Sequence, residues 1–314
     1  MQNLNLLFNK LYYQKLGSAD FEASLIDCNK KLLNATFNHA EDYKASIIVS
    51  QENYKAFLLQ TVYPGLLIGS GNPHGTSLSD EDIKIGFAFD YVTGQPCIPG
   101  SSVKGVLRSH FEDRGEAVRA ILGKEDIDVD ALAKEIFGVA RGEDEPESDG
   151  QDIFLDAVVY DGDSKGRLLG DDYITPHPSP TKNPKPIRFI KVLPDVRFEF
   201  RFILKDGTIT KEEKEKLFKE LLLLFGIGAK TNVGYGILKE CDGIIALKAP
   251  QKEDAKPAVH RASADFTKKA NAEDCRGAKC KACGQWNWRF KQGTTVEHDS
   301  WKKNKCCKCR EDLR

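Results

Sequence analysis

The sequence lacks any long apolar run. Nothing in its 314 residues approaches the ~20 consecutive apolar residues of a membrane-spanning helix, so we expect no membrane partner. The stretch Met1–Lys10 is amphipathic and lacks the apolar core of a secretory signal. We therefore expect a cytoplasmic protein. In that compartment its nine cysteines would be reduced thiols or metal ligands rather than disulfides.

The sequence also has little net charge, but the two signs are distributed unevenly. The whole chain has a formal net charge of −1. The segment Cys275–Arg314 has 11 Lys and Arg against 4 Asp and Glu, a net of +7, which leaves −8 for the rest. All three tryptophans, Trp286, Trp288 and Trp301, lie in that basic segment. This division predicts a small basic module appended to a larger body.

The stretch Gly226–Gly236 is rich in glycine and is the first candidate binding segment of the chain. Its sequence, GIGAKTNVGYG, follows a run with helical apolar spacing, Lys211–Phe225, and precedes an expected strand at Ile237. Glycines allow positive φ angles and close approach of another molecule. We take as candidate RNA-binding residues the four glycines and the polar or aromatic residues between them: Gly226, Gly228, Lys230, Thr231, Asn232, Gly234, Tyr235 and Gly236. They suit a phosphate–sugar backbone with a base packed beside it, although a helix-to-strand turn packed on its own domain is equally compatible.

Two familiar phosphate-binding loops do not fit this stretch. A Walker loop needs glycine directly before the Lys-Thr pair, and position 229 is alanine. A dinucleotide-binding fingerprint needs a strand before the glycines and a helix after them, and the expected order here is the reverse.

A second candidate segment is Ile98–Arg108, with the sequence IPGSSVKGVLR. Ser101 or Ser102 is expected to cap a helix that presents Lys104 and Arg108 on one face. Free N–H groups at a helix start, followed by two cations, suit a phosphate. The alternative is an ordinary capped helix with solvated cations.

His74 lies in a third segment, the glycine-containing stretch 69–75. It is a further candidate for RNA contact or for acid–base chemistry. Because no second titratable partner lies nearby in sequence, a solvated histidine in a turn is the simpler expectation.

The basic C-terminal segment has cysteines at metal-ligand spacing. Two C-x-x-C pairs are formed by Cys280, Cys283, Cys306 and Cys309, with 22 residues between the pairs. Such pairs predict one structural zinc in a ribbon-type site, which would stabilise a module too small for a sufficient core. Cys275 and Cys307 belong to neither pair, and Cys307 could replace a neighbouring cysteine as a zinc ligand. The alternative is that none of these cysteines binds a metal. The nearby tryptophans suit either base stacking or the core of the ribbon, and the module could also bind protein.

Three segments together resemble the RAMP superfamily, the RNA-binding subunits of CRISPR effector complexes. Ile98–Arg108 resembles the pattern IPGSSLKGxLR, and Gly226–Gly236 resembles GxGxKTxxGYG. A third stretch, Asp171–Pro178 with the sequence DDYITPHP, and the FxDA pattern at Phe154–Ala157 are similar to the sixth RAMP subunit family of Cmr (type III-B) complexes.

The resemblance implies an α+β protein with a ferredoxin-like (RRM-like) βαββαβ domain that grips guide RNA through the helix motif and the glycine-rich loop. We expect an N-terminal helical segment at 1–53, the RAMP domain at 54–247, a flexible linker at 248–274 and the zinc-ribbon module at 275–314. Such a ribbon is not a usual part of that subunit family, so its role is not implied by the resemblance.

The function implied is that of a non-catalytic subunit that binds guide RNA (crRNA) and caps the backbone of an antiviral RNA-targeting complex. Its partners would be the guide RNA and other Cmr subunits, namely the backbone RAMP subunit and the second head subunit. Target RNA is a further candidate partner. Two alternatives stay open. One is a repeat-processing endoribonuclease of the same superfamily, for which the six histidines show no obvious pairing. The other is a protein scaffold with little RNA contact.

Overall fold

The computed structural model describes residues 3–37, 53–76, 78–139, 148–175 and 186–241, and the backbone of 275–279 and 286–290. The chain divides into two compact units, Met1–Ala249 and Pro250–Arg314. In the described ranges, every helix is too short or too polar to cross a membrane. The first unit contains both the glycine-rich stretch and the helix motif.

The first unit is built on an antiparallel sheet with the strand order β12-β1-β11-β8-β4. The bounds of these strands are Tyr54–Thr61 (β1), Cys97–Ile98 (β4), Ala157–Asp161 (β8), Arg197–Ile203 (β11) and Leu238–Glu240 (β12), and β7 (Ile153–Phe154) also pairs with β11. Strand β11 forms where aromatic residues alternate along the sequence, and Phe198, Phe200 and Phe202 are all fully buried. The α+β class expected from the sequence is therefore confirmed.

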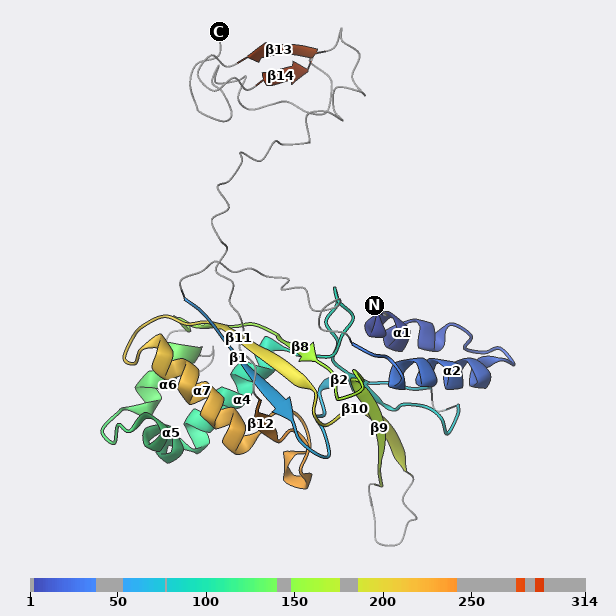
Figure 1. Cartoon of the computed structure of the whole chain (residues 1–314), viewed down its shortest axis with the longest axis horizontal. Coiled ribbons are helices and arrows are strands. Elements are labelled where there is room, and N and C mark those ends of the chain that lie inside the picture. Colours follow the sequence, from blue (N-terminus) through green and yellow to red (C-terminus); the bar gives the residue numbers. More distant parts are fainter. Residues whose placement is uncertain are drawn as a thin grey trace. The chain divides into compact units, whose positions relative to one another are not determined.

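Helices gather beside this sheet. Figure 1 shows α4 (Gly100–Asp113), α5 (Gly115–Leu122), α6 (Val129–Phe137) and α7 (Lys211–Phe225) near β1 and β11. A capping box begins α7, because Thr210 and Glu213 each bond the other's backbone N–H. Helix α6 ends at a glycine: Gly138 is its C-cap, with φ 82°.

The N-terminal helices belong to the same core. They are α1 (Leu4–Asn9), the 3-10 turn η1 (Leu11–Tyr13) and α2 (Phe21–Leu33). Buried side chains such as Phe8, Tyr12 and Leu25 join the main hydrophobic cluster of the unit. These helices therefore pack on the body through their apolar faces.

Within the described ranges, the first unit has three further two-stranded antiparallel pairs outside the main sheet. They are β2 (Gly69–Pro73) with β3 (Ile85–Phe87), β5 (Gly138–Val139) with β6 (Ser148–Asp149), and β9 (Leu169–Ile174) with β10 (Ile187–Val192). The hairpin β9–β10 carries the DDYI part of the third resemblance segment, while 176–185 lies outside the described residues.

The second unit contains one described hairpin, formed by β13 (Cys275–Lys279) and β14 (Trp286–Phe290). The strands pair antiparallel, from Cys275 opposite Phe290 to Lys279 opposite Trp286. The two strands are thus joined by a short connection, residues 280–285, which carries the first predicted C-x-x-C pair.

Candidate nucleic-acid interface

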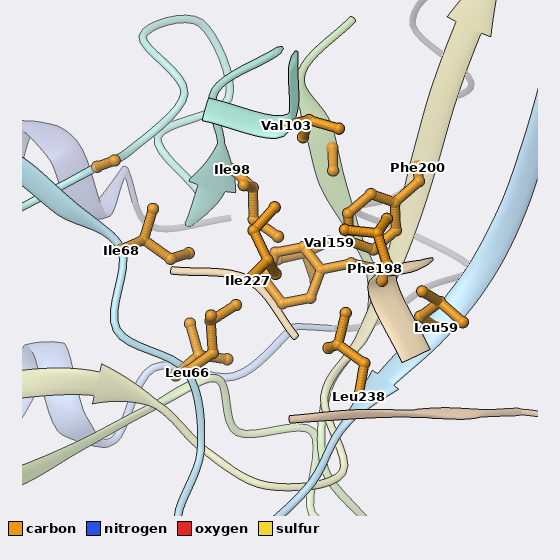
Figure 2. Close-up of a cluster of buried hydrophobic side chains, with 14 of the residues drawn as sticks. Leu59, Leu66, Ile68, Ile98, Val103, Val159, Phe198, Phe200, Ile227 and Leu238 are labelled. Carbon is orange, nitrogen blue, oxygen red and sulfur yellow. The ribbon is translucent and has the colours of Figure 1, made fainter. Parts of the chain in front are cut away.

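The glycine-rich loop and the helix motif are fixed by one hydrophobic cluster. Figure 2 shows Ile227 of the loop among buried side chains of β11, β12 and the chain after β1, close to Ile98 of the helix motif; Val103 belongs to the same cluster. Each of these three side chains is at most 1% exposed. The two candidate segments, more than 100 residues apart in sequence, therefore have a common rigid support.

The base of the glycine-rich loop is closed on its own backbone. Gly226 and Gly236 have φ angles of 74° and 78°, and a Cβ at Gly236 would overlap the carbonyl oxygen of Ile227. The Ile227 N–H donates to the Gly236 oxygen at 3.0 Å, and the Gly236 N–H donates to Gly65 at 2.9 Å. At these two positions glycine is required by packing within the domain, as the self-packing interpretation expected.

The tip of the loop is exposed. Gly228, Lys230, Thr231 and Asn232 all face solvent, and Thr231–Val233 form the 3-10 turn η2. Lys230 is held in the left-handed region, with φ 61°, and none of the described residues pairs with its ammonium group. The tip thus offers a cation, a hydroxyl and an amide to a ligand.

Tyr235 does not offer its ring to a ligand, contrary to expectation. It is 8% exposed and packs edge-on against Phe189 of β10. Its hydroxyl donates to Asp172 Oδ2 at 2.7 Å, and Lys191 Nζ lies 2.6 Å from the same oxygen. Burial raises the pKa of Tyr235, and the bond to Asp172 raises it further. Tyr235 therefore fixes the loop to the hairpin β9–β10.

Asp172 is the polar centre of that attachment. Burial acts to raise its pKa, but hydrogen bonds from Lys191 and Tyr235 outweigh this and hold the pKa of Asp172 below its usual value. The carboxylate is therefore stabilised in its charged form. Its position in the DDYI segment was visible in the sequence, but its partner Tyr235 lies 63 residues away.

The start of α4 also differs from expectation. The N-cap is Pro99, so the prediction that Ser101 or Ser102 caps the helix is wrong. The cap comes instead from Asp156, whose Oδ1 accepts from the Gly100 N–H at 2.7 Å. A Cβ at Gly100 would overlap the Phe154 carbonyl oxygen. The FxDA and IPGSS segments therefore dock directly on each other.

Capping by Asp156 leaves the side chains of the first turn of α4 available. Ser101 and Ser102 are exposed, and none of the described residues pairs with the Lys104 ammonium group. Arg108 is partly neutralised by Glu112, with Nε 2.9 Å from Oε1. Lys104 and Lys230 are thus the unpaired cations of the two segments.

His74 is buried, so the expectation of a solvated turn histidine is wrong. It is 8% exposed, stacks on Phe8 at 3.7 Å and directs its ring nitrogens at the carbonyl oxygens of Ile83 and Phe8, at 2.7 and 3.0 Å. Burial lowers the pKa of His74, although both carbonyls and Asp82 oppose this. RNA contact through its nitrogens would require these bonds to break.

A pocket of about 600 Å³ lies between the β2–β3 hairpin and the start of α4. Its lining includes His74 together with Ser101 and Ser102, which the sequence had placed in different segments. Ser70 and Asn72 add further polar groups from β2. The tertiary structure therefore brings three of the candidate residues to one pocket.

The predicted metal ligands lie outside the described residues. Cys280, Cys283, Cys306 and Cys309 are all in this group. No group of three or more His, Cys, Asp or Glu in the described ranges could hold a metal ion.

Comparison with known proteins defines the family. A model of the RAMP superfamily matches residues 58–239, which is more than half of the chain and includes both candidate segments. The chain therefore belongs to the RAMP superfamily.

Within that superfamily, the chain is similar to a subunit of a CRISPR complex. It is 32% identical over 169 residues to the CRISPR system CMR subunit Cmr6 of Saccharolobus solfataricus, a match that covers 52% of this chain. The chain spans about half the length of that relative, 51%.

Two solved structures match part of this chain. A chain in the cryo-EM structure of the type III-B Cmr-beta complex bound to cognate target RNA is 28% identical, with a TM-score of 0.45 and coverage of 62% of this chain and 61% of that one. The crystal structure of Cmr6 from Pyrococcus furiosus is 23% identical, with a TM-score of 0.37 and coverage of 61% of this chain and 100% of that one.

Proposed function

We propose that this protein is a non-catalytic subunit that binds guide RNA and caps the backbone of a type III-B CRISPR effector complex in antiviral defence. The observation that carries the proposal is the exposed loop tip, where Lys230 has no partner among the described residues. Unpaired cations beside hydroxyl and amide groups are the chemistry that binds an RNA backbone. Membership of the RAMP superfamily and similarity to Cmr6 support it.

The domain that carries the site is, in this proposal, ferredoxin-like. Four strands in the order β12-β1-β11-β8 are all antiparallel. Helix α4 lies between β1 and β8 along the chain, and α7 lies between β11 and β12. This succession matches a βαββαβ unit with extra hairpins. The Cmr subunits and crRNA are its proposed partners, and target RNA is a further one.

Replacing Lys104 and Lys230 together by alanine should weaken binding of the host's guide RNA and flatten its salt dependence. Each lost phosphate contact should reduce the slope of log K against log salt concentration by up to about one. The measurement is a titration of labelled guide RNA at several potassium chloride concentrations.

A control with the same loss of charge is available in the pair Lys165→Ala and Lys216→Ala. Both lysines are exposed and lie outside the two candidate segments. This control should retain the native slope. Native binding by the Lys104/Lys230 variant at every salt concentration would contradict the proposal. Incubating pure protein with repeat RNA in the absence of metal tests the non-catalytic part, since cleavage would indicate a processing endoribonuclease instead.

We also propose that the second unit holds one structural zinc, bound by Cys280, Cys283, Cys306 and Cys309. The β13–β14 hairpin supports this, because its connection carries the first cysteine pair, as in a metal-binding knuckle. Thiolates of this kind would bind zinc tetrahedrally and contribute its binding energy to folding of the module.

Metal analysis of protein purified without chelator should find about one zinc per chain. The double substitution Cys306→Ser and Cys309→Ser should remove it. Cys28→Ser, at a buried thiol of the first unit, is the matched control and should keep the metal. Absence of zinc from the native protein would refute this prediction.

A further inference from the structure

A turn beside the glycine-rich loop presents an exposed aromatic ring. The turn runs from Val62 to Gly65 and is closed by a hydrogen bond from the Gly65 N–H to the Val62 oxygen at 2.8 Å. Tyr63 occupies its second position and is 80% exposed. Among the described residues, none forms a hydrogen bond or an aromatic ring contact with the Tyr63 side chain. The ring is therefore free to meet a ligand.

The turn is attached to the end of the loop, so its backbone is fixed. The Val62 N–H donates to Ile237 at 3.1 Å, and the Gly236 N–H donates to Gly65 at 2.9 Å. A Cβ at Gly234 would stand 3.5 Å from Pro64 Cδ. Tyr63 is thus carried by a rigid support, which limits the ordering cost of a contact through its ring.

The loop to which this turn is attached combines exposed apolar side chains with an unpaired cation. Val233 is 68% exposed and Ile237 is 46% exposed. Lys230 is the N-cap of the 3-10 turn that ends at Val233. A ring that can stack on a base, together with a cation that attracts phosphates, is the combination that binds single-stranded nucleic acid.

We propose that Tyr63 is a base-stacking residue, on which one unpaired base of the RNA lies while the loop tip binds the adjoining phosphates. This inference rests on the proposed function and adds a contact to it. It also assigns the aromatic role that the buried Tyr235 cannot fill. A protein partner could cover the same apolar surface, but the unpaired Lys230, with Thr231 and Asn232 beside it, favours a ligand that has both phosphates and flat apolar groups.

The test compares Tyr63→Ala and Tyr63→Phe in the full chain. Loss of a stacked base should weaken binding of labelled guide RNA by about five- to a hundredfold in the alanine variant, with the salt slope unchanged because no phosphate contact is lost. The phenylalanine variant keeps the ring and should bind like the native protein. Tyr91→Ala is the matched control, because Tyr91 is 87% exposed in another turn, and it should leave affinity unchanged.

A second measurement locates the contact directly. Guide RNA containing 4-thiouridine, crosslinked by ultraviolet light, should label a peptide that contains Tyr63, identified by mass spectrometry. Native affinity in Tyr63→Ala, together with the expected loss in Lys104→Ala/Lys230→Ala, would overturn this inference and leave the proposed function standing. If both variants bind RNA normally, the proposed function fails as well. Unchanged RNA affinity with loss of a co-purifying protein subunit would show a protein-docking surface and would also overturn it.

Discussion

Replacing Gly236 by alanine should destabilise the first unit by about 2–4 kcal/mol. The residue has φ 78°, a region that costs an alanine about 1–2 kcal/mol. The new Cβ would also overlap the Ile227 carbonyl oxygen. This is a backbone atom of a residue whose N–H donates to the Gly236 oxygen, so the strain cannot relax through a side chain. Urea unfolding followed by far-UV circular dichroism measures the change.

Two other glycines serve as matched controls that separate the backbone strain from the overlap of the new Cβ. Gly123 has φ 65° but open space around it, so Gly123→Ala should cost about 1–2 kcal/mol from the backbone alone. Gly105 lies in the exposed interior of α4 with nothing near its missing Cβ. Gly105→Ala should therefore stabilise the protein by about 0.5–1 kcal/mol. If Gly236→Ala lowered the free energy of unfolding no more than Gly123→Ala does, the close backbone packing described at the base of the loop would be contradicted.

The second large effect is expected at Lys214. Its side chain is fully buried, and its ammonium group lies 2.8 Å from Asp152 Oδ2 and donates to the Lys205 carbonyl at 2.8 Å. The Asp152 carboxylate is equally buried. Lys214→Met keeps the length of the side chain but leaves that carboxylate without its counter-charge. Breaking a buried pair in this way should cost about 3–5 kcal/mol in the free energy of unfolding.

An exposed pair provides the comparison. Lys31 and Asp27 form an ion pair along α2 in which both side chains are more than half exposed. Lys31→Met should leave the unfolding midpoint close to that of the native protein, because water solvates the remaining carboxylate. Equal unfolding midpoints for Lys214→Met and the native protein would show that the buried pair does not stabilise the fold. The pair matters for the candidate site because α7, which carries Lys214, leads directly into the glycine-rich loop.

Local patterns in the sequence were sufficient to predict the helix and the glycine-rich turn around the candidate site. The apolar spacing in Lys211–Phe225 predicted α7 with its observed bounds. The four glycines of the loop all adopt positive φ, as their spacing in a helix-to-strand turn suggested. Each of these features depends on residues within a few positions of one another.

The candidate site was predicted less well because its decisive contacts join distant residues. Ser101 and Ser102 had the right chemistry to cap α4, but the Gly100 N–H donates instead to Asp156, 56 residues after Gly100. His74 had no titratable neighbour in sequence, yet Phe8 and Ile83 enclose it in the fold. Tyr235 was a candidate RNA-binding residue in the sequence, but in the fold its hydroxyl donates to Asp172 and its ring packs against Phe189.

The order of helix, loop and strand, the left-handed turns at the glycines and the RAMP patterns could be predicted from the sequence, because backbone preferences and side-chain periodicity act between near neighbours. Which polar and aromatic groups remain available to a ligand depends instead on tertiary contacts. A lysine or tyrosine is available only when no other part of the chain has paired with it or buried it. Lys104 and Lys230 have no partner among the described residues and Tyr63 is exposed, whereas His74 and Tyr235 are buried.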